Sequence, residues 1–155
     1  MIPFQRFLDE QREPVWRFLV ASVGRDGADD CFQETFLAAM KAYPRLRADS
    51  NLQAWVITIA HRKALDHHRA RARNAIPVED VPEVAFADPE PRDDATWALV
   101  RELPPKQRAA VLLRYAGDLS HAEVAEALGC STDAARRSAH EGLKKLRLEM
   151  STTTP

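Results

Sequence analysis

Residues 120–147, SHAEVAEALGCSTDAARRSAHEGLKKLR, predict a short helix, a tight turn and a second helix with a basic tail. Ser120 and Glu123 have the spacing of a capping box, in which each side chain accepts a hydrogen bond from the other residue's backbone N–H group. Gly129 is suited to end the first helix, because glycine adopts a left-handed backbone conformation at little cost. The stretch therefore contains its own start and stop signals for a helix.

The second helix of this stretch begins at Ser131 or Thr132, since both side chains can cap a helix N-terminus. Asp133 is well placed in the positively polarised first turn that follows. Two helices in this order have the arrangement of a helix-turn-helix, whose second helix enters the major groove of DNA. The motif indicates a nucleic-acid-binding protein rather than an enzyme.

Strand signals are sparse in the rest of the chain. The β-branched cluster VITI at 56–59 lies within a longer segment whose apolar residues keep helical spacing. Proline and glycine mark the ends of several segments. The expected helices cover about 3–22, with a break or bend near Pro14, and about 27–43, 51–73, 96–102, 105–116, 120–128 and 132–148.

Charge is unevenly distributed, although 22 Lys and Arg nearly balance 23 Asp and Glu. Residues 1–75 carry 12 basic against 9 acidic side chains, residues 76–96 carry 1 against 7, and residues 97–155 carry 9 against 7. Prolines accompany the acidic residues of the middle segment, and proline is unfavourable inside helices and central strands. We predict an all-α protein of two small helical domains, 1–75 and 96–150, joined by an acidic, proline-rich linker over 76–95.

The expected helix 51–73 passes from an apolar half, NLQAWVITIA, to a cationic half, HRKALDHHRARAR. Such a helix suits contacts with phosphates, although a solvated basic face is the simpler alternative. The histidines at 61, 67 and 68 raise the question of zinc. No cysteine or carboxylate completes a recognisable ligand spacing, so no metal is predicted.

Other functional classes find little support in the sequence. There is no Gly-rich phosphate loop, metal-ligand set or evident nucleophile with its base, so no catalytic residue and no cofactor is predicted. Cys31 and Cys130 are far apart and are expected to be small buried residues. A signal peptide and an apolar run of about 20 residues are lacking, which favours a cytoplasmic protein without membrane insertion.

Both halves resemble the extracytoplasmic-function (ECF) class of bacterial RNA polymerase sigma factors. GADDCFQETFLAAMKAY (27–43) and NLQAWVITIAHRKALDHHRARAR (51–73) are similar to two helices of the family's region 2. LPPKQRAAVLLRYAGDLSHAEVAEALGCS (103–131) is similar to its region 4. The paired motifs, in this order over roughly 3–147, are more specific than a helix-turn-helix alone. The resemblance implies a protein that binds core RNA polymerase, recognises the −10 and −35 promoter elements and promotes DNA melting.

The resemblance also implies roles for individual positions. The helix that docks on the clamp of the core polymerase would carry Asp29, Asp30, Gln33, Glu34 and Phe36. Trp55 would support the melted strand or pack beneath the loop before it. The −10 element would be contacted by that loop and the following helix, through Arg47, Asp49, Ser50, Asn51, Trp55, Arg62, Lys63, Asp66, His67 and Arg69. The −35 element would be read by Arg136, Arg137, Ser138 and His140.

The expected recognition helix departs from the family pattern. Ala135 and Ala139 stand where bulkier core residues are usual, and Gly142 inside the helix costs roughly 1 kcal/mol. Neither the promoter sequence nor an anti-sigma protein, which commonly holds family members inactive, is identified by any residue. The alternative is an independent helix-turn-helix regulator that acts without core polymerase, and the basic helix 51–73 disfavours it.

Overall fold

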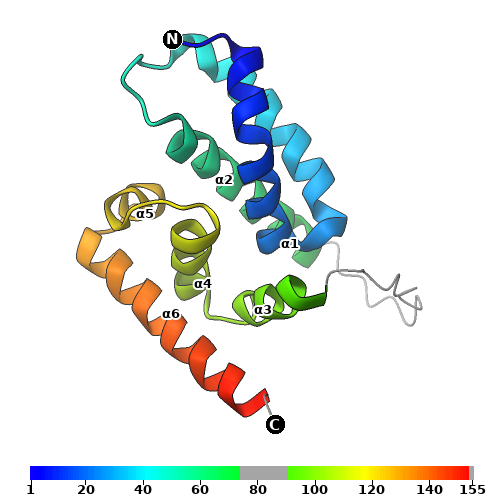
Figure 1. Cartoon of the computed structure of the whole chain (residues 1–155), viewed down its shortest axis with the longest axis vertical. Helices are drawn as coiled ribbons and strands as arrows, with labels where there is room; N and C mark the ends of the chain where they lie inside the picture. Colours follow the sequence, from blue (N-terminus) through cyan, green and yellow to red (C-terminus); the bar gives the residue numbers. More distant parts are fainter. Residues whose placement is uncertain (74–90, 154–155) are drawn as a thin grey trace.

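The computed structural model describes residues 1–73 and 91–153, and these residues form helices and the turns between them (Figure 1). No strand occurs in the described ranges, so the all-α prediction is confirmed. None of the helices in these ranges combines the length and hydrophobicity that a membrane span requires. The elements are α1 (Phe4–Ala42), the 3-10 turn η1 (Tyr43–Arg45), α2 (Leu52–Arg73), α3 (Pro91–Arg101), α4 (Pro105–Val111), the π-helical turn η2 (Leu112–Ala116), α5 (His121–Leu128) and α6 (Thr132–Thr153).

Helix α1 consists of two arms, 4–23 and 25–42, that are joined at Gly24. Gly24 has φ 79° and ψ 170°, which lie outside the helical region, and a positive φ of this size strongly favours glycine. The backbone stays helical at Pro14, so no break occurs there, and the break at Gly24 falls in the gap predicted between the helices 3–22 and 27–43. The fixed φ of proline is compatible with a helix, and its cost arises from a lost hydrogen bond and local crowding.

Aromatic rings fill the space between the two arms and α2. Phe7 is fully buried, and its ring centroid lies 5.5 Å from that of Phe4, 5.2 Å from Tyr43 and 5.7 Å from Trp55. These separations lie in the range in which aromatic pairs attract each other. The Tyr43 hydroxyl donates a hydrogen bond to the backbone carbonyl of Ile2, which ties the end of the second arm to the start of the chain.

The helix-turn-helix forms as predicted from residues 120–147. The Glu123 backbone N–H donates to Ser120 Oγ (3.1 Å), and the Ser120 backbone N–H donates to Glu123 Oε1 (2.9 Å), which completes the capping box. Gly129 ends α5 with φ 68°. The Ser131 hydroxyl accepts a hydrogen bond from the Ala134 backbone N–H (3.1 Å), so Ser131 caps α6.

Small residues allow α6 to pack closely on α4. Ala135 and Ala139 are buried, and a Cβ atom built on Gly142 would lie only 2.6 Å from Cγ2 of Val111. A larger side chain at Gly142 would therefore force the two helices apart. This close approach explains the small apolar face of α6, which the sequence alone presented as a departure from the family pattern.

Helix α3 begins five residues before the predicted start at 96. Proline and acidic side chains predict a linker at 91–95, yet these residues form the start of α3. Proline is favourable at the first position of a helix, where its missing N–H group has no partner to lose. The rest of the predicted linker, 76–90, lies outside the described residues. Helix α6 extends to Thr153, beyond its predicted end.

The two helical halves pack against each other (Figure 1). Arg101 of α3 donates a hydrogen bond from Nη1 to the Ala21 carbonyl of α1 (3.2 Å). Gly117 lies against Ile57 of α2, which is fully buried, and a Cβ atom on Gly117 would approach Ile57 Cγ2 to 2.8 Å. Helix α5 consequently lies beside α2, with a cavity between them.

Candidate nucleic-acid interface

The loop before α2 is presented to solvent at the start of a capped helix. Asn51 caps α2, because its Oδ1 accepts a hydrogen bond from the Ala54 backbone N–H (3.1 Å). Arg47 and Asp49 are exposed and form a loose pair, with 3.8 Å between Nε and Oδ1. Ser50 is half-buried beside them. Since surface ion pairs of this kind contribute little, both charged groups are available to another molecule.

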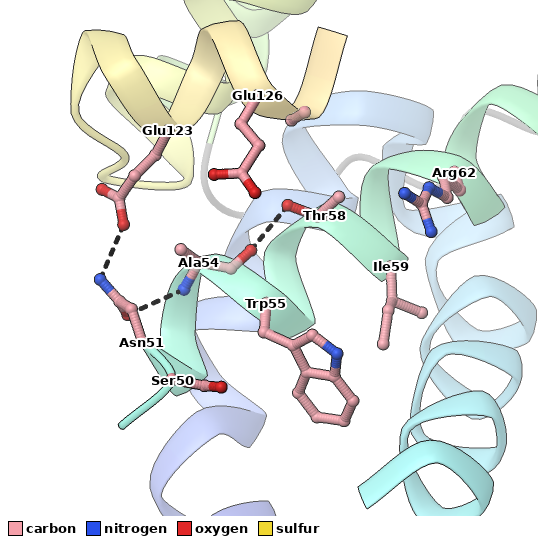
Figure 2. A pocket seen from close by; sticks show the side chains of 10 residues that line it. Ser50, Asn51, Ala54, Trp55, Thr58, Ile59, Arg62, Glu123 and Glu126 are labelled. Atoms are coloured by element: carbon pink, nitrogen blue, oxygen red, sulfur yellow. Dashed lines mark hydrogen bonds between the residues drawn. The ribbon is translucent and has the colours of Figure 1, made fainter. Parts of the chain in front are cut away.

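Trp55 lies in the first turn of α2, directly after this loop. Its ring centroid lies 5.7 Å from that of Phe7 and 6.3 Å from that of Tyr43, so one side of the indole belongs to the aromatic core. The side chain also lines a cavity of about 390 Å³ between α2 and α5 (Figure 2). Trp55 thus packs on the aromatic core and also lines the cavity, and its support of a melted strand stays a prediction.

The second half of α2 has an exposed cationic surface. Arg62 and Arg69 are exposed, and Lys63 is half-buried. Asp66 is the acidic residue within this half of the helix, and its Oδ1 lies 3.8 Å from Arg69 Nη1. The surface therefore keeps a net positive charge, which suits phosphate contacts.

His61, by contrast, belongs to the contact between the two halves. It is 6% exposed, and its ring lies edge-on to Phe18 with 6.5 Å between centroids. Burial, followed by the positive charges of Arg62 and Arg108, lowers the pKa of His61 from 6.5 to about 4. The imidazole is therefore neutral at physiological pH and serves packing rather than phosphate binding.

The other two histidines of α2 point toward α1. His68 Nε2 lies 2.9 Å from the Ser22 carbonyl oxygen, and burial lowers the pKa of His68. His67 occupies the space beside Gly27, where a Cβ atom would come within 2.5 Å of His67 Nε2. No group of three potential metal ligands converges within residues 1–73 and 91–153. His67 is thus half-buried against α1 and less available to DNA than its position in the sequence suggested.

The second arm of α1 combines exposed acidic and exposed apolar side chains. Its acidic and amide groups at 29, 30, 33 and 34 are exposed, whereas Phe36 is 6% exposed and stacks at 4.8 Å from the ring of Phe32. The Phe36 side chain therefore packs on the buried side of the second arm and is not available to a partner. Leu37 and Met40 are about half exposed on the same arm. Sequence reasoning missed these two, because apolar residues at helical spacing are usually core, although an exposed apolar pair beside charges is typical of an interface.

The two cysteines have different environments. Cys31 is buried in the second arm, and burial, together with the nearby carboxylates of Glu34, Asp30 and Asp66, raises its pKa from 9.0 to about 11. Cys130 is exposed in the turn between α5 and α6, so the prediction that it is buried is wrong. The turn of a helix-turn-helix lies at the surface, and this position outweighs the usual preference of cysteine for burial.

The candidate recognition helix α6 keeps its polar side chains accessible. Arg136, Arg137 and His140 are exposed, and Ser138 is half-buried. Arg136 Nη1 lies 3.3 Å from Asp133 Oδ1 in the first turn. Guanidinium groups at the start of a recognition helix have the geometry to bind guanine edges in the major groove.

Comparison with known proteins matches each half of the chain to a family model. Residues 8–74 match the model of Sigma-70 region 2, and residues 93–146 match the model of Sigma-70, region 4. The chain is 38% identical over 146 residues to the ECF RNA polymerase sigma factor SigD of Mycobacterium tuberculosis, an alignment that covers 86% of this chain and 69% of SigD. The chain belongs to the ECF sigma factor family. It is also 35% identical over 136 residues to the ECF sigma factor ShbA of Streptomyces griseus, covering 79% and 71%.

Solved structures share the fold of this sigma factor. The sigma factor RpoE from Bartonella quintana, in complex with the anti-sigma factor NepR, aligns over 98% of both chains with a TM-score of 0.77 and 22% identity. CnrH, in complex with the cytosolic domain of CnrY, aligns over 97% of this chain and 89% of its own with a TM-score of 0.72 and 21% identity. Family members act with RNA polymerase in promoter-specific initiation and are not enzymes by themselves. These matches give no support to an independent regulator.

Proposed function

We propose that this sigma factor docks on core RNA polymerase through the second arm of α1, reads the −10 element with α2 and its preceding loop, reads the −35 element with α6, and promotes melting of the −10 region. One observation carries the proposal: a single chain contains both matched regions, and each presents an exposed cationic helix. Core polymerase and promoter DNA are then its partners, and the cytoplasm is its place of action.

The −10 surface suits DNA that has left the duplex. Extruding a base costs a few kcal/mol in lost stacking and pairing, so the protein must supply compensating contacts. The loop at 47–51 offers the exposed charged groups of Arg47 and Asp49 to a base, and Arg62 and Arg69 offer charge to the strand. The ring of Trp55 lines the adjoining cavity. Aromatic and cationic groups combined in this way are typical of single-strand binding sites.

The docking role is tested by co-elution with core RNA polymerase. Neutralising the exposed carboxylates of the second arm with Asp29→Asn, Asp30→Asn and Glu34→Gln should weaken co-elution at least tenfold. A matched control neutralises three exposed carboxylates of the C-terminal half, with Glu102→Gln, Asp118→Asn and Glu141→Gln, and should bind as the wild type does. Equal loss in both variants, or no binding by folded wild-type protein, would count against the proposed function.

The −10 role is tested with the holoenzyme, that is, core polymerase with this sigma factor bound. The DNA templates are promoter fragments from which this holoenzyme produces run-off transcripts. Replacing Arg62, Lys63 and Arg69 by Gln should reduce permanganate-detected opening strongly while leaving co-elution with core polymerase unchanged. The control replaces Arg12, Arg17 and Lys41 by Gln, which removes the same charge from α1. Normal opening by the α2 variant would remove these residues from the −10 surface.

The −35 role is tested on the same fragments. Arg136→Ala or Arg137→Ala should weaken holoenzyme binding by about 1–3 kcal/mol if the residue makes a bidentate base contact. The effect should vanish when the −35 sequence is scrambled, whereas Lys145→Ala, further along α6, should not discriminate between the two DNAs. Identical binding of an arginine variant to matched and scrambled DNA would exclude the base contact.

An anti-sigma factor is a further proposed partner, because RpoE was solved in complex with the anti-sigma factor NepR and shares this fold. A protein of this class would compete with core polymerase. Its identity can be sought by affinity capture with the full chain, and the capture should be reversed by added core polymerase.

A further inference from the structure

A cavity lined by both apolar and charged side chains lies where α2 meets α4 and α6. Its volume is about 540 Å³. Sites that bind small molecules usually have volumes of roughly 300–1,000 Å³. Packed protein interiors contain few voids larger than a water molecule, so a space of this size is not an ordinary packing defect. None of the proposed contacts with polymerase or DNA requires a cavity at this place.

Apolar groups from four helices form much of the cavity wall. They are contributed by Leu65 of α2, Pro105 and Ala109 of α4, Leu128 of α5 and Ala134 of α6. Leu65, Leu128 and Ala134 are only half-buried, so apolar surface remains uncovered there. Covering apolar surface is favourable, and an apolar ligand would do so.

Helix α6 contributes one continuous face to the same cavity. Ala134, Arg137, Ser138 and Glu141 all line it. Residues spaced by three and four positions lie on one side of a helix, so the small side chain of Ala134 and the longer polar ones face the cavity together. The face combines an open apolar position with groups that can bind a polar atom.

The charged groups of the lining favour a negative ligand. Arg137 and Lys106 are basic, and Glu141 is the acidic member of the set. Neither basic group forms an ion pair within residues 1–73 and 91–153. The Glu141 carboxylate, in contrast, accepts a hydrogen bond from Gln107 Nε2 at 3.4 Å. Two free cations therefore outweigh one engaged carboxylate.

His61 adds a buried polar group from α2. It is 6% exposed and lines the cavity, and its ring packs edge-on to Phe18. No hydrogen bond of this imidazole occurs in the part of the chain that the structure describes. Burial, then the charges of Arg62 and Arg108, lower the pKa of His61, so the neutral ring lies in a positive potential and has one N–H to donate.

The cavity between α2 and α5 has the opposite balance of charge. Its lining includes one basic side chain, Arg62, and two acidic ones, Glu123 and Glu126. An anion that suits the cavity between α2, α4 and α6 should therefore be repelled by this neighbouring one. The two cavities supply a comparison within one molecule.

We propose that the cavity between α2, α4 and α6 binds a small amphipathic acid, with an apolar body such as a medium-chain acyl group and a carboxylate head group held by Arg137, Lys106 and His61. A guanidinium group binds a carboxylate through charge-assisted, directional hydrogen bonds. The apolar body would cover Leu65 and Leu128. Such binding uses none of the proposed contacts with polymerase or DNA, so it is tested on the free full-length chain.

The first experiment is calorimetric titration of the full chain with decanoate below its critical micelle concentration. We expect one saturable site. Hexanoate should bind at least roughly tenfold more weakly, because four fewer methylene groups are buried. Decyltrimethylammonium, with the same chain and a positive head group, should also bind at least tenfold more weakly. Absence of a saturable site, or equal affinity for either of the two control compounds, would overturn the proposal.

Charge variants test the head-group contacts. Arg137→Gln should weaken decanoate binding roughly tenfold through loss of a charged hydrogen bond. Glu141→Gln should strengthen it about threefold, because a repulsive carboxylate is removed. Arg136→Gln is the matched control, since this exposed neighbour on α6 does not line the cavity, and it should bind decanoate as the wild type does. Equal losses in both arginine variants would refute the assigned contact.

A cavity-filling variant tests the location. Ala134→Leu should abolish decanoate binding, whereas Ala127→Leu, which fills the cavity between α2 and α5, should leave it unchanged. Decanoate should raise the melting temperature of the wild type and of Ala127→Leu but not of Ala134→Leu. Wild-type binding by Ala134→Leu would exclude this cavity. If Ala134→Leu fails to fold, the exposed Arg137→Gln still decides. Failure of the proposed function is seen separately, as loss of co-elution with core polymerase.

Discussion

In residues 1–73 the helices are held apart by large aromatic rings, whereas in residues 91–153 α4 and α6 lie close together because the residues between them are small. Phe7 represents the first kind of packing, with three ring neighbours within 6 Å, and Gly142 the second, with room for no side chain at all. These two contacts thus have opposite sensitivities. The contact around Phe7 should be weakened by removing volume, and the contact around Gly142 by adding it.

The largest effect is expected from removing volume in the N-terminal half. Phe7→Ala should lower the free energy of unfolding by about 3–5 kcal/mol, because it leaves a cavity among packed rings. Urea denaturation followed by tryptophan fluorescence measures the loss. Phe4→Ala is the control, since Phe4 is only half-buried. A loss for Phe7→Ala no larger than for Phe4→Ala would contradict the aromatic description of this half.

A lower pH should reduce the free energy of unfolding through His61, which lies at the contact between the two halves. Its pKa is about 4 in the folded chain and 6.5 ordinarily, so between these values the unfolded chain binds a proton that the folded chain does not. The stabilisation that comes from keeping His61 neutral is fully present above pH 6.5 and is lost as the pH falls toward 4. It contributes about 3 kcal/mol to the free energy of unfolding.

The check is a series of urea denaturations from pH 7 to pH 4. The fall in stability should be much smaller for His61→Gln than for the wild type. The control, His140→Gln, changes an exposed histidine of α6 and should keep the wild-type slope. An unchanged slope in His61→Gln would assign the acid sensitivity to other groups.

Adding volume should weaken the C-terminal half. In most helix interiors Gly→Ala stabilises by about 1 kcal/mol, but Gly142→Ala should destabilise by about 1–2 kcal/mol, because the new methyl group meets Val111. Thermal unfolding monitored by circular dichroism measures the sign. Combining Gly142→Ala with Val111→Ala should remove the clash, so that the two changes are not additive. A stabilised Gly142→Ala variant would show that α4 and α6 have room between them.

The smallest effect is expected at the caps that fix the ends of the helix-turn-helix. Ser120→Ala should cost ~1 kcal/mol, because the Glu123 N–H group at the start of α5 loses its acceptor, Ser120 Oγ. Ser131→Ala should cost about the same at the start of α6. Equilibrium denaturation of both variants, with Ser151→Ala near the end of α6 as the control, measures these losses. A neutral Ser120→Ala would mean that the capping box is not maintained in solution.

The helix-turn-helix was predictable to individual hydrogen bonds because its signals are local. Ser120 and Glu123 are three residues apart, and Gly129 acts through its own backbone, so no distant contact is needed to interpret them. The same holds for the family resemblance, which depends on short motifs in a fixed order. Local chemistry of this kind survives in the folded chain unless tertiary contacts oppose it.

Contacts between distant residues could not be predicted in this way. The Asn51–Glu123 bond spans two segments with no shared periodicity, and the need for Gly142 depends on the distance between α4 and α6. The family resemblance placed Phe36 on a docking helix but did not distinguish its buried side from the exposed side that carries Leu37. Proline predicted a break or bend at Pro14, where the backbone stays helical, whereas the gap predicted between 22 and 27 does contain the break, at Gly24.

Because the two cysteines have different environments, one of them can be labelled selectively without any substitution. A maleimide dye at neutral pH would react at the exposed thiol of Cys130, since the Cys31 thiol is buried and its pKa is about 11. Cys130 lines the cavity between α6 and α2. A polarity-sensitive dye attached there would report in real time whether this cavity changes during assembly with polymerase.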